Sequence, residues 1–306
     1  DDTGDGSRSN PWYSWDAANS SLNAGDILFL RGGSYTANDF NGASQFWQWR
    51  FQNLTGTLSD TIRIMNHPGE SPVWTLNGSQ PGLSVSSTVT LIDGCDYVYF
   101  RGLRLSNAPQ DNSNMVLYGF DVINSSNIVL DRCVADSLSG SGFTFGNEMW
   151  GRISNTEVSE NILVLNCDSY GHADPNSTTP YGGSDGFNVT HNTSAEQERN
   201  NWIVNITFRG CRAYFNSDDG WDNFRNDSGP VLLENCWAFY NGKDKADSTN
   251  TGDGIGFKLG PSGISCTDYE QFTIQNCISI ENRGHGFDEN STNYSSIHKF
   301  YNNISY

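Results

Sequence analysis

Hydrophobic and polar positions alternate in short segments along the chain, and one such segment recurs through its C-terminal half. Five copies are six residues long and end in cysteine: Ile128–Cys133, Ile162–Cys167, Ile206–Cys211, Val231–Cys236 and Phe272–Cys277. Residues 98–103 and 298–303 carry the same pattern, with Leu and Asn at the last position. Short segments rich in β-branched and aromatic residues predict strands, and their recurrence predicts a repeat architecture.

A glycine–aromatic pair follows each of these cysteines and sets the length of the repeat. The pair begins nine residues after the cysteine at Gly142, Gly220 and Gly286. It begins nineteen residues after the cysteine at Gly186 and twenty at Gly256, so we expect loop insertions around residues 173–183 and 243–253. Coils of about 25 residues with short strands, and with loops inserted at one corner, are typical of a parallel β-helix.

The predicted fold is therefore all-β: a single right-handed parallel β-helix over residues 1–306. Equivalent residues of successive coils should stack about 4.8 Å apart, so the aromatic and cysteine columns should fill the core. We expect buried free thiols, with disulfides between coils as the alternative and with Cys95 and Cys266 outside the column. An amide ladder, interrupted by His172, is expected at the turn that contains Asn216, Asn241 and Asn282.

The N-terminal part has a different pattern. Residues 15–22 have helical spacing and precede a strand-like segment at 25–31. We expect an amphipathic helix that caps the open end of the solenoid, so that residues 1–35 form the cap and the first strand. The chain ends on a strand-like copy at Tyr306, so we expect either that the sequence shown is incomplete or that its true end is covered by something else.

The charge of the chain limits its partners. A formal net charge of −18 argues against nucleic acid or an anionic membrane surface as a partner held by bulk electrostatics. No stretch approaches the roughly 18 apolar residues of a membrane span, so we expect none. If the ligand is a polyanion, a local feature such as a bound divalent cation must reverse the field.

Twelve Asn-X-Ser/Thr sequons exceed what composition alone would produce, and this excess favours a secreted protein with N-glycans. Their asparagines are Asn19, Asn53, Asn77, Asn124, Asn176, Asn188, Asn192, Asn205, Asn226, Asn290, Asn293 and Asn303.

Two outward columns gather acidic residues. One residue before the glycine, Asp185 stacks on Asp219, and Asp218 is adjacent in the chain. Alternation from the inward aromatic directs Asp222 outward on the same coil. Four carboxylates on two neighbouring coils would repel one another, and a hard cation such as Ca²⁺ resolves this. The alternative is a solvated acidic turn.

Lys258 is the next residue in the column of Asp222 and lies between glycines in the segment 254–260. A neighbouring metal ion would lower the pKa of the amine and let it accept a proton, whereas Asp222 would raise that pKa. An ion pair between the two side chains is the structural alternative.

Four segments together resemble polysaccharide lyase family 9, the pectate lyases built on a right-handed parallel β-helix. They are Ser184-Asp185-Gly-Phe, Asn216-Ser-Asp218-Asp219-Gly-Trp-Asp222, Gly256-Phe-Lys258-Leu-Gly260 and Gly286-Phe-Asp-Glu-Asn290. The resemblance implies that the catalytic Ca²⁺ is bound by Asp185, Asp218, Asp219 and Asp222, and that Lys258 is the base. It also implies β-elimination on α-1,4-linked polygalacturonate or pectin, with an alkaline optimum.

Two other functions fit parts of the sequence. Gly284-His285-Gly286 resembles an element of galacturonan hydrolases on the same fold, but the sequence has no downstream Arg-X-Lys to complete that pattern. The second alternative is a non-catalytic extracellular β-helix glycoprotein, structural or carbohydrate-binding. Glycans at Asn188 or Asn226 would crowd the proposed cleft and would favour this alternative.

Overall fold

The computed structural model describes ten segments of the chain, which carry one helix and 26 strands. These segments are residues 3–37, 47–76, 86–110, 114–146, 158–189, 203–223, 230–243, 252–260, 272–289 and 298–306. The predicted sites at Cys266, at the sequons of Asn77, Asn192, Asn226, Asn290 and Asn293, and in most of the 243–253 loop lie outside the described residues.

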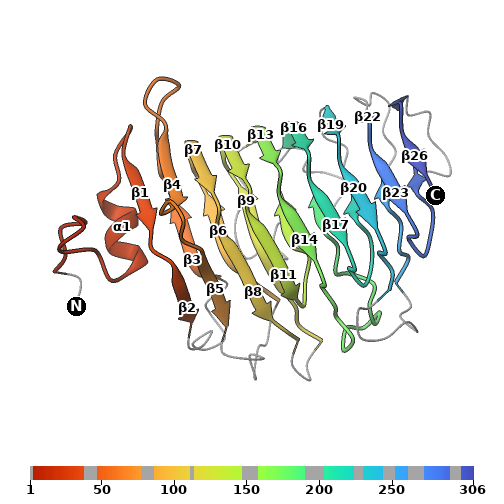
Figure 1. Ribbon diagram of the computed structural model, residues 1–306, viewed down its shortest axis with the longest axis horizontal. Coiled ribbons are helices and arrows are strands. Elements are labelled where there is room, and N and C mark those ends of the chain that lie inside the picture. The colour runs from red at the N-terminus through yellow and green to blue at the C-terminus, as the bar shows by residue number, and fades with distance from the viewer. Residues whose placement is uncertain are drawn as a thin grey trace.

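All the strands belong to three parallel sheets that run along the molecule, with the two chain ends at opposite ends of the stack (Figure 1). Sheet A contains β1 (Ile27–Leu30), β4 (Ile62–Asn66), β7 (Asp96–Arg101), β10 (Ser126–Asp131), β13 (Ser159–Leu165), β16 (Ile203–Arg209), β19 (Val231–Glu234), β22 (Phe272–Gln275) and β25 (Lys299–Tyr301). Sheet B contains β2 (Gly33–Ala37), β5 (Pro72–Leu76), β8 (Arg104–Ala108), β11 (Val134–Leu138), β14 (Asp168–Tyr170), β17 (Arg212–Tyr214), β20 (Trp237–Phe239), β23 (Ile278–Ile280) and β26 (Ile304–Ser305). Sheet C contains β3 (Trp47–Gln52), β6 (Ser87–Asp93), β9 (Leu117–Ile123), β12 (Phe143–Phe145), β15 (Phe187–Val189), β18 (Trp221–Asp222), β21 (Phe257–Lys258) and β24 (Phe287–Asp288).

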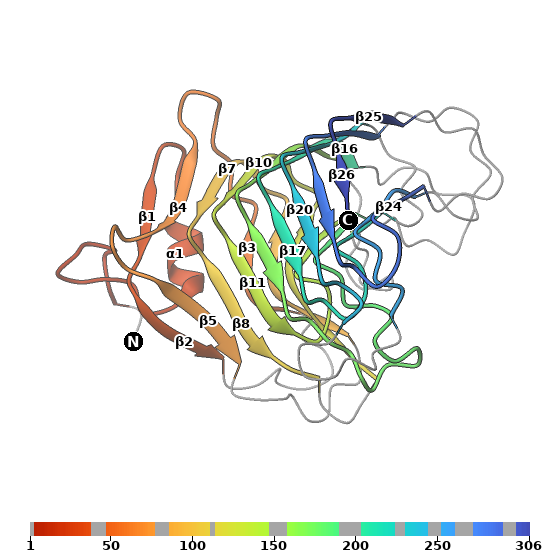
Figure 2. The same cartoon turned by 45° about the vertical axis from the view of Figure 1, so that its right-hand side comes forward.

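Each strand pairs with the strand three places further along the chain, which is the connectivity of a parallel β-helix. Every coil therefore visits sheets A, B and C in turn before the chain rises to the next coil (Figure 2). Parallel connections of this kind are right-handed in almost all proteins. The predicted all-β parallel β-helix is confirmed. No helix in the described segments has the length and apolar character needed to cross a membrane.

The predicted aromatic column lies in the core on the inner side of sheet C. Its rings are fully buried from Phe143 to Phe257 and stack face to face, with centroids 5.0 Å apart for Phe143 and Phe187 and 4.7 Å apart for Phe187 and Trp221. Phe120 extends the stack on one side and Phe287 on the other. The spacing matches the distance between paired strands, so each ring contacts the rings of the neighbouring coils.

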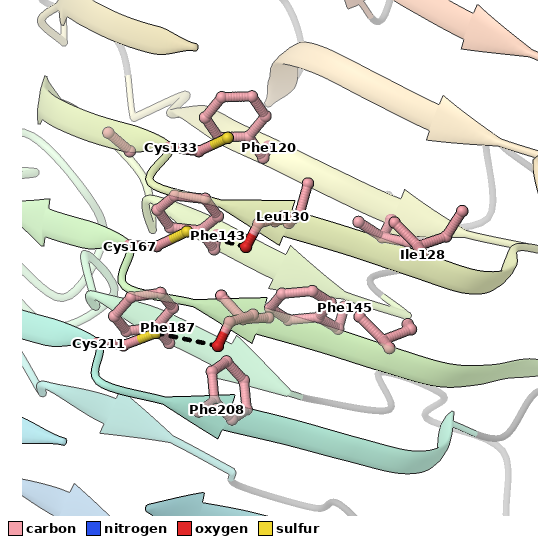
Figure 3. Close-up of a cluster of buried hydrophobic side chains, with 14 of the residues drawn as sticks. Phe120, Ile128, Leu130, Cys133, Phe143, Phe145, Cys167, Phe187, Phe208 and Cys211 are labelled. Carbon is pink, nitrogen blue, oxygen red and sulfur yellow. Dashed lines mark hydrogen bonds between the residues drawn. The ribbon is translucent and has the colours of Figure 1, made fainter. Parts of the chain in front are cut away.

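The predicted cysteine column is also internal, and all its members are free thiols. Figure 3 shows three of these thiols beside the stacked phenylalanines. The Cys167 thiol lies 3.3 Å from the carbonyl oxygen of Leu130, and the Cys211 thiol lies 3.3 Å from that of Val164. Each thiol therefore donates to the strand one coil earlier, and this satisfies it without a disulfide. Cys95 is likewise buried and free.

The residue before each column cysteine explains where the chain turns from sheet A to sheet B. This residue, and its equivalent before Leu103 and Asn303, adopts a positive φ in every described copy, a conformation that glycine and asparagine tolerate best. The residues are Gly102, Arg132, Asn166, Gly210, Asn235, Asn276 and Asn302. The recurring Asn-Cys and Gly-Cys dipeptides are therefore corner signals.

The predicted capping helix is α1 (Trp15–Ser21). Ser14 is its N-cap residue, and the Ser14 side chain accepts a hydrogen bond from the backbone N–H of Ala17. The indole of Trp15 donates to the Arg50 carbonyl oxygen at 2.8 Å and packs edge-on against Phe51, with ring centroids 4.1 Å apart. The helix thus covers the apolar end of the first coils, which would otherwise face solvent.

The stack predicts a large cost for removing one of its rings. Phe143→Ala should lower the free energy of unfolding by about 3–5 kcal/mol, because its neighbours on both sides lose a partner and a cavity remains. Phe300→Ala is the matched control: Phe300 is 48% exposed, and its loss should cost within about 1 kcal/mol. Denaturant unfolding followed by tryptophan fluorescence measures both, and equal effects would contradict this account of the core.

Candidate metal centre and active site

The candidate site is built on the turn that joins sheet B to sheet C. In the coil of β17 and β18 this turn carries Asp218 and Asp219, and in the preceding coil it carries Asp185. The glycine after each acidic position allows the coils to stack closely. A Cβ at Gly186 would lie 2.6 Å from the Gly220 carbonyl oxygen, and one at Gly220 would lie 2.5 Å from that of Gly256.

The predicted amide ladder holds these turns in register. The amide nitrogen of Asn216 donates to Oδ1 of Asn241 at 3.1 Å, and that of Asn241 donates to Oδ1 of Asn282 at 2.9 Å. Each Oδ1 also accepts the backbone N–H of the preceding coil, at 3.2 Å for Asn216 and 2.9 Å for Asn241. Buried amides satisfied in this way fix the backbone that leads into the acidic turn.

His172 takes the ladder position one coil earlier. Its Nδ1 accepts the backbone N–H of Leu138 at 3.2 Å, so the proton lies on Nε2, which donates to Ser169 Oγ at 2.9 Å. Ser169 in turn donates to the carbonyl oxygen of Gly186 at 2.7 Å, directly after Asp185. Burial lowers the pKa of His172 to about 3. The imidazole is therefore neutral and structural.

Three of the four predicted carboxylates converge. Asp185, Asp218 and Asp219 each offer an oxygen within 4.8 Å of the others, and all three are buried. Two side-chain donors orient Asp185: its Oδ2 accepts from Oγ of buried Ser141 at 3.1 Å and from Nδ2 of half-buried Asn188 at 3.0 Å.

Backbone N–H groups complete the arrangement. The N–H of Asp219 donates to Asp185 Oδ1 at 3.1 Å, and the N–H of Ile255 donates to Asp219 Oδ1 at 2.6 Å. The N–H of Asp253 donates to Asp218 Oδ1 at 2.7 Å. The cluster is thus pre-organised by three successive coils.

Burial is the largest cause that raises the pKa of each of these three carboxyl groups. The charge of Asp219 raises the pKa of Asp218 further, and the Lys258 ammonium opposes the shift in all three. Three close, buried carboxylates are costly as anions unless a cation compensates them. An all-oxygen donor set of this kind fits a hard divalent ion, and Ca²⁺ in particular.

Lys258 reaches the cluster from the next coil. Its Nζ lies 2.9 Å from Asp219 Oδ2, 3.5 Å from Asp253 Oδ2 and 3.9 Å from Asp222 Oδ1. Burial alone would lower the pKa of Lys258, but the charges of Asp222, Asp219 and Asp185 outweigh it and raise that pKa above its ordinary value. Without a metal ion, the amine is a protonated partner of the cluster.

The structure brings the predicted acidic residues and Lys258 together, with one difference from the predicted arrangement. Asp222 pairs in register with Lys258, as expected, but it lies outside the group of three converging carboxylates. Of the described carboxylates in ion pairs with Lys258, Asp219 lies nearest, because the long lysine side chain crosses from one column to the next.

Two acidic residues near the site were missed by the sequence analysis. Asp253 contacts Lys258, and buried Asp174 accepts a hydrogen bond from Ser217 Oγ at 3.3 Å. Both lie in the predicted loop insertions, where the repeat assigns no register. Their only sequence signal is their position within those insertions.

The amide of Asn188 bears on glycosylation. Because Asn188 Nδ2 donates to Asp185, a sugar attached to that nitrogen would enter the acidic cluster. The hydrogen bond from Asn188 to Asp185 therefore requires that Asn188 carry no glycan.

Comparison with known proteins identifies the family. The sequence model described as "Pel9A-like, right handed beta helix region" matches residues 1–306. The chain belongs to the Pel9A-like right-handed β-helix family. A crystal structure of pectate lyase Pel9A has a TM-score of 0.72 and 25% sequence identity to this Pel9A-like chain, and the match covers 98% of this chain and 74% of that one.

Curated relatives of this Pel9A-like chain are named as pectate lyases. It is 28% identical to pectate lyase L of Thermoclostridium stercorarium over 314 residues, which is 99% of this chain and 21% of the relative. It is 27% identical to pectate lyase L of Dickeya chrysanthemi over 292 residues, which is 94% of this chain and 59% of the relative. The chain thus spans less than two thirds of the length of these relatives.

The buried imidazole predicts a component of the pH dependence of stability. Since the pKa of His172 is about 3 when folded and near 6.5 when unfolded, the unfolded state takes up the proton first as pH falls. The stability due to the neutral imidazole is complete above pH 6.5 and is lost progressively towards pH 3. His172→Asn, which places the residue of the other ladder positions here, should lose less stability between pH 6.5 and 4. Denaturant unfolding across that range tests this, and parallel curves for both proteins would refute it.

Proposed function

We propose that this chain is the catalytic β-helix of an extracellular, calcium-dependent pectate lyase that cleaves α-1,4-linked polygalacturonate by β-elimination. The observation that carries the proposal is the buried Lys258 amine, 2.9 Å from a cluster of three converging carboxylates. The family membership and the pectate lyases among its relatives support the reaction class. The net charge of −18 makes a local cation necessary for a polyanionic substrate.

Asp185, Asp218 and Asp219 would hold Ca²⁺, with Asp222 beside Lys258 at the edge of the group. When bound, the ion supplies charge neutralisation of the substrate carboxylate and acidifies the proton at C5. Asn188 and Ser141 keep Asp185 oriented, and the amide ladder keeps the two turns in register.

Lys258 is the proposed base. It has to be neutral to accept the C5 proton, so the carboxylates that now raise its pKa must be compensated by the cation. The electron pair of the C5–H bond then forms the C4–C5 double bond. The C4–O bond breaks, the leaving oxygen takes up a proton from solvent, and Lys258 returns the C5 proton to solvent. The products are an unsaturated uronide and a new chain end.

Replacement of the base is the first test. Lys258→Ala should lower kcat on polygalacturonate by about 10²-fold or more, because proton abstraction loses its acceptor. The absorbance of the unsaturated product in the ultraviolet measures the rate, and Ca²⁺ binding should persist. Lys299→Ala, which removes an exposed lysine of sheet A, is the control and should leave the rate unchanged. Retained turnover in Lys258→Ala would refute the assignment.

Removal of the metal is the second test. A chelator should abolish formation of the unsaturated product, and added Ca²⁺ should restore it. Asp219→Asn should weaken calcium binding by about tenfold or more in a calorimetric titration, since it removes a buried ligand charge. Asp168→Asn, on the outer face of sheet B, should bind Ca²⁺ like the parent chain.

These assays also separate the two alternatives. A galacturonan hydrolase would release reducing ends without ultraviolet absorbance, and a non-catalytic sugar-binding β-helix would release no product.

A further inference from the structure

Another acidic residue on sheet C, Asp121, faces outward near the N-terminal side of the acidic cluster. Asp121 on β9 pairs in register with Leu91 of the coil before and Thr144 of the coil after. The same column continues through Asn188 to Asp222. One coil, that of β12, therefore lies between the coil of Asp121 and the coil that carries Asp185.

The surroundings of Asp121 leave its charge without a partner. Asp121 is fully buried, and within the described segments neither of its carboxylate oxygens accepts a hydrogen bond of good geometry, although the hydroxyls of Thr144 and Thr88 lie near enough to lower its pKa. The hydroxyl oxygen of buried Thr88, on the preceding coil, is likewise without such a hydrogen bond. Buried polar groups in folded proteins are almost always paired, and an isolated carboxylate is the most costly exception.

The nearby charges do not compensate Asp121. Asp93 forms an ion pair with Arg50 and accepts from Asn124 Nδ2 at 2.9 Å, so that pair is neutral as a unit. Tyr118, the other titratable neighbour, is an uncharged phenol, because burial raises its pKa above the ordinary value. An ionised Asp121 would therefore carry one negative charge that no described neighbour compensates.

Charge balance indicates which ligand would fit. A buried ion pair is tolerable only when its charges cancel, so one carboxylate matches one monovalent cation, whereas a divalent ion would leave a buried excess. The oxygen donors are hard: the two Asp121 oxygens and the hydroxyls of Thr88 and Thr144. The Thr144 hydroxyl donates its proton to the Phe120 carbonyl oxygen at 3.4 Å, which leaves its lone pairs available.

We propose that Asp121, Thr88 and Thr144 form a structural site for an alkali cation, Na⁺ or K⁺, distinct from the calcium centre. The bound ion would stabilise the stacking of β6, β9 and β12. Burial raises the pKa of Asp121 to about 8, and the hydroxyls of Thr144 and Thr88 oppose this rise. A protonated, hydrated Asp121 is therefore the competing state.

Thermal unfolding tests the site. The chain is melted at fixed Ca²⁺, pH and ionic strength in NaCl, in KCl and in N-methyl-D-glucamine chloride, whose cation is too large to enter. The Tm should be higher by about 2 °C or more in at least one alkali salt, since the ion binds only the folded state. In Asp121→Asn, which is nearly isosteric, this difference should vanish.

Asp136→Asn is the matched control. Asp136 is also buried, but it is paired with Arg104 at 2.7 Å, so its replacement should lower Tm equally in all three salts. Equal Tm values of the parent chain in the three salts would overturn the proposal in favour of a protonated Asp121. An alkali-specific difference that persists in Asp121→Asn would also overturn it, because the ion would then bind elsewhere.

Discussion

The stacking of successive coils at the spacing of paired β-strands is the constraint on which the rest of the structure depends. It brings equivalent side chains to within about 5 Å of one another along the whole molecule. For aromatic rings this spacing is favourable, as the centroid distance of 4.7 Å between Trp221 and Phe257 shows. For carboxylates the same spacing is unfavourable, so an acidic column on the outer face requires a cation. The core and the candidate site are two consequences of one geometry.

The site also depends on the turn between sheets B and C. The Asn216–Asn241–Asn282 ladder fixes that turn from inside, and glycines such as Gly220 let its backbone pass close to the next coil. The acidic side chains project from this rigid support, and Lys258 arrives from the following coil. A site assembled from three coils can exist only if their register is exact to one residue, because a slip by one residue would turn every side chain to the other face.

The sequence predicted much of this arrangement because the repeat supplies its own register. The cysteine and glycine–aromatic landmarks gave the inward columns and, by alternation, the pairing of Asp222 with Lys258. The repeat could not predict that Lys258 contacts Asp219 most closely, since that depends on how a long side chain crosses between columns. Nor could it place Asp174 or Asp253, which lie in the insertions. The burial of Asp121 could not be predicted either, because alternation directs this residue outward and does not show what covers it.

Anomalous diffraction from crystals grown with Ca²⁺ would show whether the carboxylate cluster holds the ion. We predict an anomalous peak between Asp185, Asp218 and Asp219, with the Lys258 amine facing it. An ion-free cluster in saturating Ca²⁺, with Lys258 still paired to Asp219, would contradict the account and leave a structural ion-pair network in its place.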